Sequence, residues 1–266
     1  MKIYFIGAGK MATALAAGIV RDGLFKADEL CACDVNPAAR AAFTQATGIR
    51  CEASAAQEIQ NAETILLAVK PQVAEEAVKA LTPLKGNPLV ISICAGIPIQ
   101  KLSGWFGTGK LIRVMPNTPL MVGCGASCFA LGPNATEQDS TLAAKILGAL
   151  GIAFQVSEDK LDAVTGLSGS GPAYFFEMIK AMTEAGKAVG LQEDLSLELS
   201  IQTMMGAARM LQAKLGTPDS LRDAVTSPHG TTAAGLEVLK NAGFRELIAA
   251  VVKAATDRSV ELGQGK

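Results

Sequence analysis

The stretch Met1–Leu15, MKIYFIGAGKMATAL, decides the fold of this chain. Lys2–Ile6 is a short run rich in apolar residues with high strand propensity, and two glycines follow it closely. An alanine-rich helical pattern then starts near Lys10 without a break. This order predicts a strand, a tight glycine turn and a helix.

The glycine turn has the pattern GxGxxA, carried by Gly7, Gly9 and Ala12. In such turns the first glycine makes the bend, the second lets a pyrophosphate approach the backbone, and the small third residue lets the helix pack on the strand. The helix start then offers unpaired N–H groups and a positive dipole end to phosphates. A bare turn without a ligand is the alternative, but the position directly after an N-terminal strand favours a dinucleotide site.

Charge and cysteine content exclude several classes of protein. Lys and Arg number 24 against 25 for Asp and Glu, so the formal net charge is −1 and nucleic acid is not an expected partner. The six cysteines include no CxxC pair and there is one histidine, so we expect reduced, buried thiols and no metal site. We find no cleavable leader and no run long enough to cross a bilayer, which predicts a cytoplasmic protein without a membrane partner.

Strand-like and helix-like stretches alternate along the first half of the chain. Runs such as Thr64–Val69 are apolar throughout, as in parallel strands that are covered on both faces. This alternation predicts a Rossmann-type, doubly wound α/β sheet, whose ligands bind at the carboxyl ends of the strands. The expected strands are Lys2–Ile6, Glu29–Cys33, Thr64–Val69, Leu89–Ile93, Lys110–Val114, Ala126–Ala130 and Ile152–Val156.

Asp34 ends the second expected strand, about 20 residues after the glycine motif, where ribose hydroxyls are usually held. Asn36 is expected to cap the next helix, which places Asp34, Asn36 and Arg40 at the adenosine end of the site. Asp34 favours a free 2′-hydroxyl and hence NAD, whereas Asn36, Arg40 and the helix start could hold the 2′-phosphate of NADP. A third interpretation is that Asp34 only ends a strand.

Past Ser157 the pattern is helical only. The stretch Leu195–Leu215 is apolar nearly all round, so in a small domain it calls for partners on several sides, as a subunit interface provides. At 266 residues the chain is long for a single core. We therefore predict a dinucleotide-binding domain at residues 1–157 and an all-α dimerisation domain at residues 158–266.

Two segments of the helical half carry unusual residues. Gly166–Tyr174, GLSGSGPAY, is expected inside a helix, where each glycine costs about 1 kcal/mol relative to alanine, which favours close approach of another helix or of the ligands. Ser227–Thr232, SPHGTT, joins two helices, so its hydroxyls and N–H groups converge at a helix start. Such a start binds a small carboxylate, although an ordinary cap and turn is the alternative.

Five segments together resemble the pyrroline-5-carboxylate reductase family over nearly the whole chain: GAGKM at 7–11, AVKPQ at 68–72, MPNTP at 115–119, GLSGSGPAYFF at 166–176 and SPHGTT at 227–232. The resemblance implies NAD(P)H-dependent reduction of 1-pyrroline-5-carboxylate to L-proline, the last step of proline biosynthesis. It also implies a homodimer through the C-terminal helices and leaves a higher assembly of dimers open. The expected cofactor is NADPH, with NADH as the alternative.

The resemblance also implies which residues form the site. Substrate contacts are expected from Ser227, Gly230, Thr231 and Thr232, with Thr232 as the catalytic residue. Cofactor contacts are expected from Gly7, Ala8, Gly9, Lys10, Met11, Asp34, Asn36, Arg40, Ala68, Val69, Lys70, Pro71, Ala95 and Asn117. Asn117 is expected near the nicotinamide or, alternatively, as the cap of its proline-flanked turn.

Two positions depart from the family pattern. The family usually has a small residue, most often glycine, where this chain has His229, and NADPH-using members often have a small or hydroxyl side chain where it has Asp34. Two other functions also stay open: a reductase of another cyclic imino acid, and a dinucleotide-sensing protein without turnover.

Overall fold

A computed structural model describes residues 1–55, 57–81 and 83–264 of the chain. The chain divides into two compact units. The first consists of Met1–Ser170 together with Ala254–Lys266, and the second of Gly171–Lys253. The boundary expected near Ser157 falls inside the first unit, and the division into domains at 1–157 and 158–266 stays a prediction.

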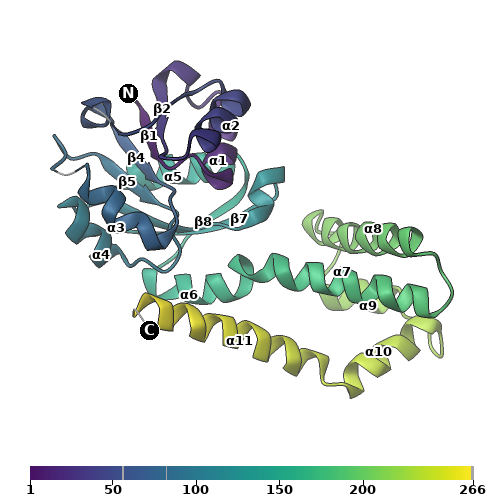
Figure 1. Cartoon of the computed structure of the whole chain (residues 1–266). Coiled ribbons are helices and arrows are strands. Elements are labelled where there is room, and N and C mark those ends of the chain that lie inside the picture. Colours follow the sequence, from purple (N-terminus) through teal and green to yellow (C-terminus); the bar gives the residue numbers. More distant parts are fainter. Residues whose placement is uncertain (56, 82, 265–266) are drawn as a thin grey trace. The chain divides into compact units, whose positions relative to one another are not determined.

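The first unit contains an eight-stranded sheet with the order β3-β2-β1-β4-β5-β6-β7-β8 (Figure 1). All neighbouring strands from β3 to β6 are parallel, and β1 lies between β2 and β4, where the order reverses. The predicted doubly wound sheet is therefore confirmed. Its strands are β1 (Ile3–Ile6), β2 (Leu30–Cys33), β3 (Arg50–Glu52), β4 (Thr64–Leu67), β5 (Leu89–Ser92), β6 (Leu111–Met115), β7 (Gly125–Leu131) and β8 (Gly151–Gln155).

Two features of the sheet were not predicted. Strand β3 is three residues long and pairs only with β2, so its sequence is too short for an alternating pattern to show. Strand β7 runs antiparallel to β6. The link between β6 and β7 contains a single 3-10 turn, Thr118–Val122. A parallel β7 would need a longer crossover connection, usually a helix, to bring the chain back to the start of β6.

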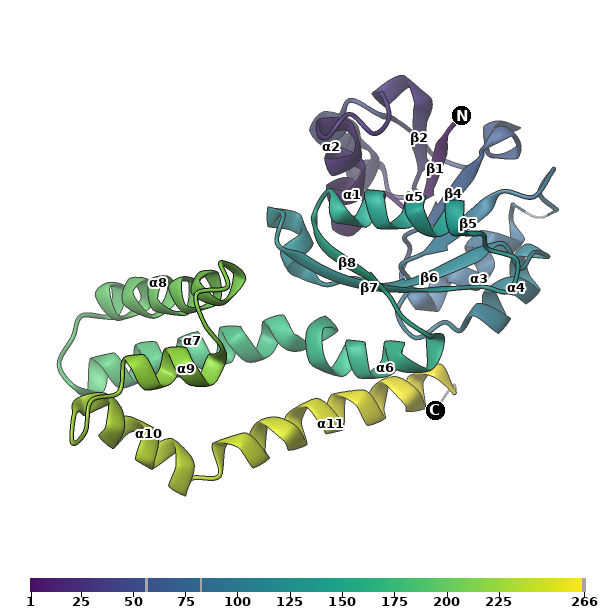
Figure 2. The same cartoon turned by 180° about the vertical axis from the view of Figure 1, so that it is seen from behind.

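Helices cover both faces of the sheet (Figures 1 and 2). Strand β1 shows why, because Ile3 and Phe5 point into one core while Tyr4 and Ile6 point into the other. The first core includes Phe43 of α2 and residues of α1 and α5, and the second includes residues of α3, α4 and α6. These helices are α1 (Lys10–Arg21), α2 (Pro37–Thr47), α3 (Pro71–Lys79), α4 (Ile99–Phe106), α5 (Glu137–Gly148) and α6 (Leu161–Val164).

The glycine-rich segment expected inside one helix is not a regular helix. Helix α6 ends at Val164, and Thr165–Gly169 forms a turn of π-helix, closed by a hydrogen bond of 2.8 Å from Ser170 N–H to Thr165 O. Gly169 packs so tightly on Met115 that a Cβ added to it would collide with Met115 Cε. Gly169 thus permits close packing on Met115 at the end of β6, whereas a Cβ added to Gly171 would meet nothing within 4 Å.

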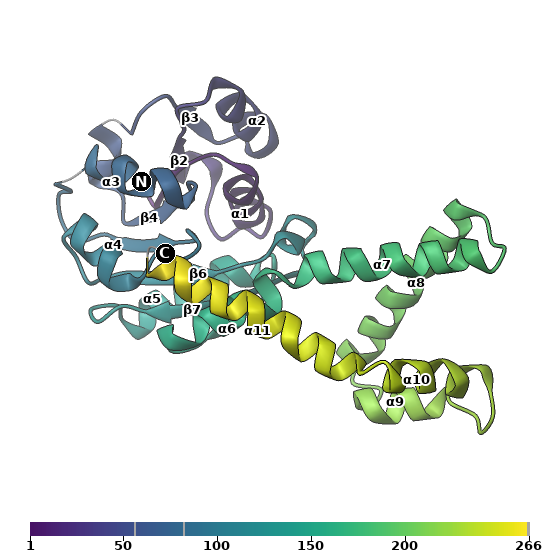
Figure 3. The same cartoon turned by 60° about the horizontal axis from the view of Figure 1, so that its bottom comes forward.

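The far end of helix α11 (Phe244–Gly263) belongs to the first unit, and Figure 3 shows α11 as one unbroken helix. Ser259 Oγ donates to Asp162 Oδ1 at 2.7 Å, and the Arg113 guanidinium lies 3.9 Å from that oxygen. Arg113, whose side chain is 9% exposed, also pairs with Glu158 at 3.1 Å. This half-buried network attaches the end of α11 beside β6.

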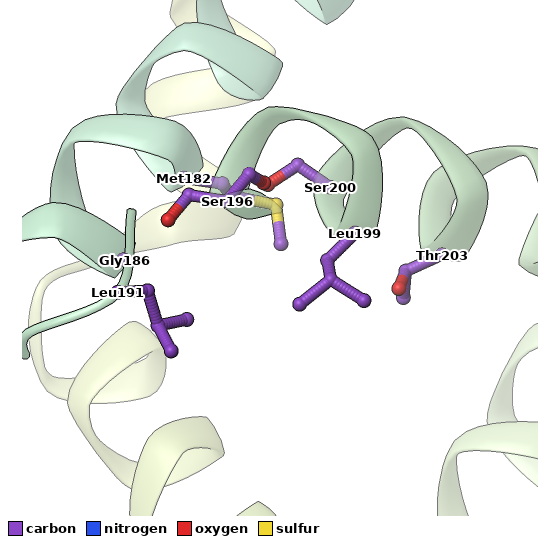
Figure 4. A pocket seen from close by; sticks show the side chains of 7 residues that line it. All are labelled: Met182, Gly186, Leu191, Ser196, Leu199, Ser200 and Thr203. Carbon is purple, nitrogen blue, oxygen red and sulfur yellow. The ribbon is translucent and has the colours of Figure 1, made fainter. Parts of the chain in front are cut away.

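The second unit comprises α7 (Gly171–Ala188), α8 (Glu193–Gln212), α9 (Pro218–Ala224), α10 (Thr231–Asn241) and the first part of α11. Helices α7 and α8 pack along one another. They are close enough that a Cβ added to Gly186 would lie only 2.5 Å from Ser196 Oγ. A shallow groove between them is lined mainly by small and apolar residues (Figure 4): Met182, Gly186, Leu191, Ser196, Leu199, Ser200 and Thr203.

The second unit has no apolar core of its own. None of its described large apolar side chains is buried, and Phe176 and Val238 are 66% and 67% exposed. Helix α8, predicted to be apolar nearly all round, exposes Leu199 and Ile201 as well. So many exposed large apolar side chains on one set of helices indicate an interaction surface.

The cysteines are free thiols. Burial raises the pKa of Cys33 and of Cys94 to about 11, so both are neutral. The expectation that all six are buried is wrong for Cys124, which is exposed, and for Cys51 and Cys128, which are only half-buried.

Candidate functional site

The turn after β1 can be made only by glycine at its first position. Gly7 has φ of +100°, and a Cβ added to it would lie 2.7 Å from Ala68 O in the loop after β4. Its N–H donates to Cys33 O at the end of β2, at 2.8 Å. The turn therefore touches the ends of both neighbouring strands.

The second glycine leaves space where the first does not. Gly9 precedes α1 in an extended conformation, no side chain caps the helix, and a Cβ added to Gly9 would meet nothing within 4 Å. Gly9 and Lys10 are exposed. The uncapped N–H groups of the first helical turn thus face open space, an arrangement that fits a pyrophosphate.

The three residues expected at the adenosine end form one hydrogen-bonded cluster. The Asp34 carboxylate accepts from Ala8 N–H at 2.9 Å and from Asn36 N–H at 2.8 Å. Arg40 Nη1 donates to Asp34 O at 2.9 Å, and Asn36 caps α2 through Ala38 N–H at 3.0 Å. Asp34 is thus fixed against the glycine turn and does more than end a strand.

The loops after β4 and β5 reach the same edge of the sheet. Ala68 and Val69 continue β4, the exposed Lys70 precedes α3, and Pro71 is the first residue of that helix. Cys94 Sγ lies 3.2 Å from Val69 O, which joins this loop to the one that carries the exposed Ala95. The structure therefore brings all the expected cofactor residues after β1, β2, β4 and β5 to one edge.

Asn117 has neither a free side chain nor a capping role. Its Oδ1 accepts from Ala126 N–H at 2.9 Å, and its Nδ2 donates to Ser168 O at 3.1 Å. No side chain caps the turn that follows Asn117. Sequence reasoning missed the link to Ser168, because no local pattern signals a partner 51 residues away.

The expected substrate residues lie together in the second unit. Gly230 precedes α10, its N–H donates to Ser227 O at 3.0 Å, and a Cβ added to it would collide with Ser227 Oγ. Thr231 and Thr232 form the first turn of α10, which no side chain caps. His229 adopts φ of +57°, a conformation that favours glycine. The loop thus brings the Ser227 hydroxyl next to an uncapped helix start.

A possible metal-binding group lies elsewhere in the first unit. Cys31, Glu52 and Glu58 offer ligand atoms within 4.8 Å of one another, among the described residues. However, Arg50 forms ion pairs with both carboxylates, at 3.4 Å to Glu52 and closer to Glu58. The guanidinium already supplies the positive charge at this place.

Comparison with known proteins identifies the family. Residues 158–262 match the family model of pyrroline-5-carboxylate reductase dimerisation, and residues 2–96 match a model described as NADP oxidoreductase, coenzyme F420-dependent. A pyrroline-5-carboxylate reductase of Arabidopsis thaliana is 41% identical over 264 residues, which cover 99% of this chain and 96% of the plant protein. The chain belongs to the pyrroline-5-carboxylate reductase family. The resemblance seen in the sequence is thereby confirmed.

Solved structures of this family have the same fold. A pyrroline-5-carboxylate reductase from Coxiella burnetii is 33% identical with a TM-score of 0.90 and covers 98% of both chains. The Plasmodium falciparum pyrroline carboxylate reductase, solved with NADP bound, is 31% identical with a TM-score of 0.87 and covers 99% of this chain and 98% of its own. Within the part of the chain that the structure describes, no helix has the length and apolarity to cross a membrane.

The two glycines of the turn should respond differently to alanine. Gly9→Ala should fold normally, because the methyl group meets no protein atom, but it should bind dinucleotide about 10–100-fold more weakly by blocking charge-assisted hydrogen bonds. Gly7→Ala should instead lower the melting temperature. Fluorescence titration with reduced dinucleotide and thermal unfolding of both variants check this. Wild-type affinity in Gly9→Ala would contradict the pyrophosphate placement.

Proposed function

We propose that this chain reduces 1-pyrroline-5-carboxylate to L-proline with NADPH, as the last enzyme of proline biosynthesis, acting in the cytoplasm. The full-length relationship to the plant reductase carries the proposal, because it spans both the glycine turn and the Ser227–Thr232 loop. The NADP-bound Plasmodium relative supports the choice of cofactor. NADH is accepted as a second cofactor.

The cofactor residues have separate tasks. The first turn of α1 holds the pyrophosphate, Asp34, Asn36 and Arg40 contact the adenosine ribose, and the loops 68–71 and 94–96 line the nicotinamide half. NADPH, when bound, supplies the hydride for the carbon of the C=N bond. Lys10 and Met11 contribute backbone N–H groups to the pyrophosphate. Asn117 lies at the nicotinamide end of the same edge of the sheet.

The substrate residues hold a small anionic ring. The carboxylate binds at the start of α10, to the Ser227 hydroxyl and to the N–H groups of Gly230 and Thr231. The Thr232 hydroxyl is directed at the ring nitrogen or at the carboxylate. The nitrogen carries a proton before the neighbouring carbon takes up the hydride, so hydride addition to the iminium gives the amine directly. A protonated imine is already electrophilic, so the protein needs to orient its ligands more than to act as a strong acid.

The second unit supports a homodimer. Its helices expose large apolar side chains and lack a core, and the matching family model is one of dimerisation. A second copy of α7 and α8 would cover these faces, since symmetric pairing of like surfaces is the commonest assembly. We propose that the substrate site is complete only in this dimer, while a higher assembly of dimers stays open.

An assay of purified protein tests the function. Mixing the protein with NADPH and pyrroline-5-carboxylate should lower the absorbance of the reduced nicotinamide and form proline. Faster turnover of a six-membered cyclic imino acid would favour the alternative reductase. Dinucleotide binding without any oxidation would leave only the sensing protein.

Asp34 should set cofactor preference. Its carboxylate lies beside the position of a 2′-phosphate, but Arg40 and the start of α2 offset the repulsion, so the wild-type chain should use NADPH. Asp34→Ser should raise kcat/KM for NADPH relative to NADH by about tenfold, or ~1.4 kcal/mol. Asp28→Ser, at an exposed position, is the control. Wild-type activity with NADH alone would refute this placement.

The two hydroxyls of the loop should affect different kinetic constants. Thr232→Ala should mainly lower kcat, by the equivalent of about 1–3 kcal/mol for an unmade buried hydrogen bond, whereas Ser227→Ala should mainly raise the substrate KM. Thr226→Ala is the matched control, because its hydroxyl is bound to Arg222 O at 2.6 Å. Unchanged kinetics in Thr232→Ala would remove it from the site.

His229 should not be the essential proton donor. His229→Gly should keep most of the turnover and should relieve about 1 kcal/mol of strain, since glycine adopts φ of +57° freely. His229→Ala removes the imidazole but keeps the strain, so it separates the two effects. A kcat lower by several orders of magnitude in both variants would show that the imidazole is catalytic.

Dimerisation and turnover should be linked. The mass found by sedimentation and the activity should fall together over the same dilution series. Residues 1–157 alone should fold and bind dinucleotide without reducing the imine, because all eight strands and the glycine turn are present there, but with a lower melting temperature than the whole chain, because Leu161 and the end of α11 are missing. A fully active monomer would show that the dimer does not complete the site.

A further inference from the structure

Asn117 joins three segments that are distant in sequence. It follows β6 directly, its Oδ1 accepts from Ala126 N–H in β7, and its Nδ2 donates to Ser168 O in the π-type turn Thr165–Gly169. A carboxamide donates through its nitrogen and accepts through its oxygen within one plane, which a carboxylate cannot do. The residue type is therefore matched to this double link.

The turn that Asn117 binds is held by its own hydrogen bonds and by one from outside. Thr165 Oγ donates to Leu161 O at 2.8 Å, and Ser168 Oγ donates to Val164 O at 3.1 Å. In this wide turn the Asn117 side chain supplies a hydrogen bond to Ser168 O. Gly169 meanwhile sits directly against Met115, the last residue of β6. Together these contacts fix the turn to the end of that strand.

The turn lies on the half of the sheet that would face the nicotinamide. The order of strands reverses between β1 and β4, and Asp34 marks the adenosine side beyond β2. A dinucleotide lying across this point directs its other end toward the carboxyl ends of β4, β5 and β6. Leu167 in the turn is 65% exposed, so the turn presents an apolar side chain at this edge instead of burying it.

We propose that Asn117 is a positioning residue for hydride transfer. Through its bond to Ser168 O it holds the turn Thr165–Gly169 at the nicotinamide end of the site, so that the reacting atoms keep their alignment. This role rests on the proposed function. It differs from direct contact between Asn117 and the cofactor, because it depends on the two bonds that the side chain makes to the chain itself.

The variant Asn117→Asp isolates the bond to the turn. Aspartate keeps the shape and the acceptor for Ala126 N–H, but it replaces the donor with an oxygen that faces the Ser168 carbonyl. Asn117→Ala removes both bonds and serves as the second variant. Asn87→Asp is the matched control, because Asn87 Oδ1 accepts from Thr108 Oγ at the exposed surface.

In Asn117→Asp we expect kcat to fall by about 100-fold, as for a misplacement of about 1 Å, while KM for both substrates stays within about threefold. The isotope effect from NADPH deuterated at the transferred position should rise, because hydride transfer becomes rate-limiting. Amide hydrogen exchange should accelerate in residues 165–170 and stay unchanged in β1 and β4, which shows that the fold is intact. A purely structural role would not raise the isotope effect.

Three outcomes would overturn the proposal. Wild-type exchange in residues 165–170 of Asn117→Asp would show that the side chain does not hold the turn. Faster exchange with unchanged kcat and isotope effect would show that the turn does not position the reaction, and a rise in KM alone would assign a binding role. A wild-type chain that binds NADPH but never oxidises it would instead refute the proposed function, and the positioning role with it.

Discussion

The close approach of Gly7 to Ala68 O is the constraint on which the site depends. It sets the distance between the turn after β1 and the loop after β4, at the point where strand order reverses. The bond from Ala8 N–H to Asp34 then fixes the end of β2 against the same turn. Three loops are thus held by backbone geometry and one carboxylate, so the edge is organised before any ligand arrives.

Most of the first unit could be predicted because its information is local. Strands buried on both faces show as unbroken apolar runs, and the predicted strand Leu89–Ile93 differs from β5 by one residue. The adenosine cluster also followed from local order, since Asp34, Asn36 and Arg40 are neighbours in sequence. What failed were features set by distant partners: the short strand β3, the π-type turn and the bond from Asn117 to Ser168. The residue pattern of one segment does not show which distant segment it is hydrogen-bonded to.

In the second unit, local sequence patterns predict the helices but do not account for their stability. Its helices were predicted from their spacing, but their stability cannot come from the single chain. Burial of apolar surface is the main force in folding, and here the large side chains of α7, α8 and α10 stay exposed. The sequence could indicate this need because α8 is apolar on several sides. The left-handed conformation of His229 was not predicted, although the glycine that the family most often has at this position is the usual residue for a positive φ.

The return of α11 to the first unit has a consequence for biosynthesis. The ribosome finishes all eight strands long before it makes Ser259, which ties α11 to Asp162. Until then the place beside β6 that the end of α11 occupies is uncovered, and Asp162 has the Arg113 guanidinium at 3.9 Å but lacks the Ser259 hydroxyl. The α/β unit is therefore not closed when its strands are complete. A stalled or prematurely released chain would leave this surface open to chaperones and proteases.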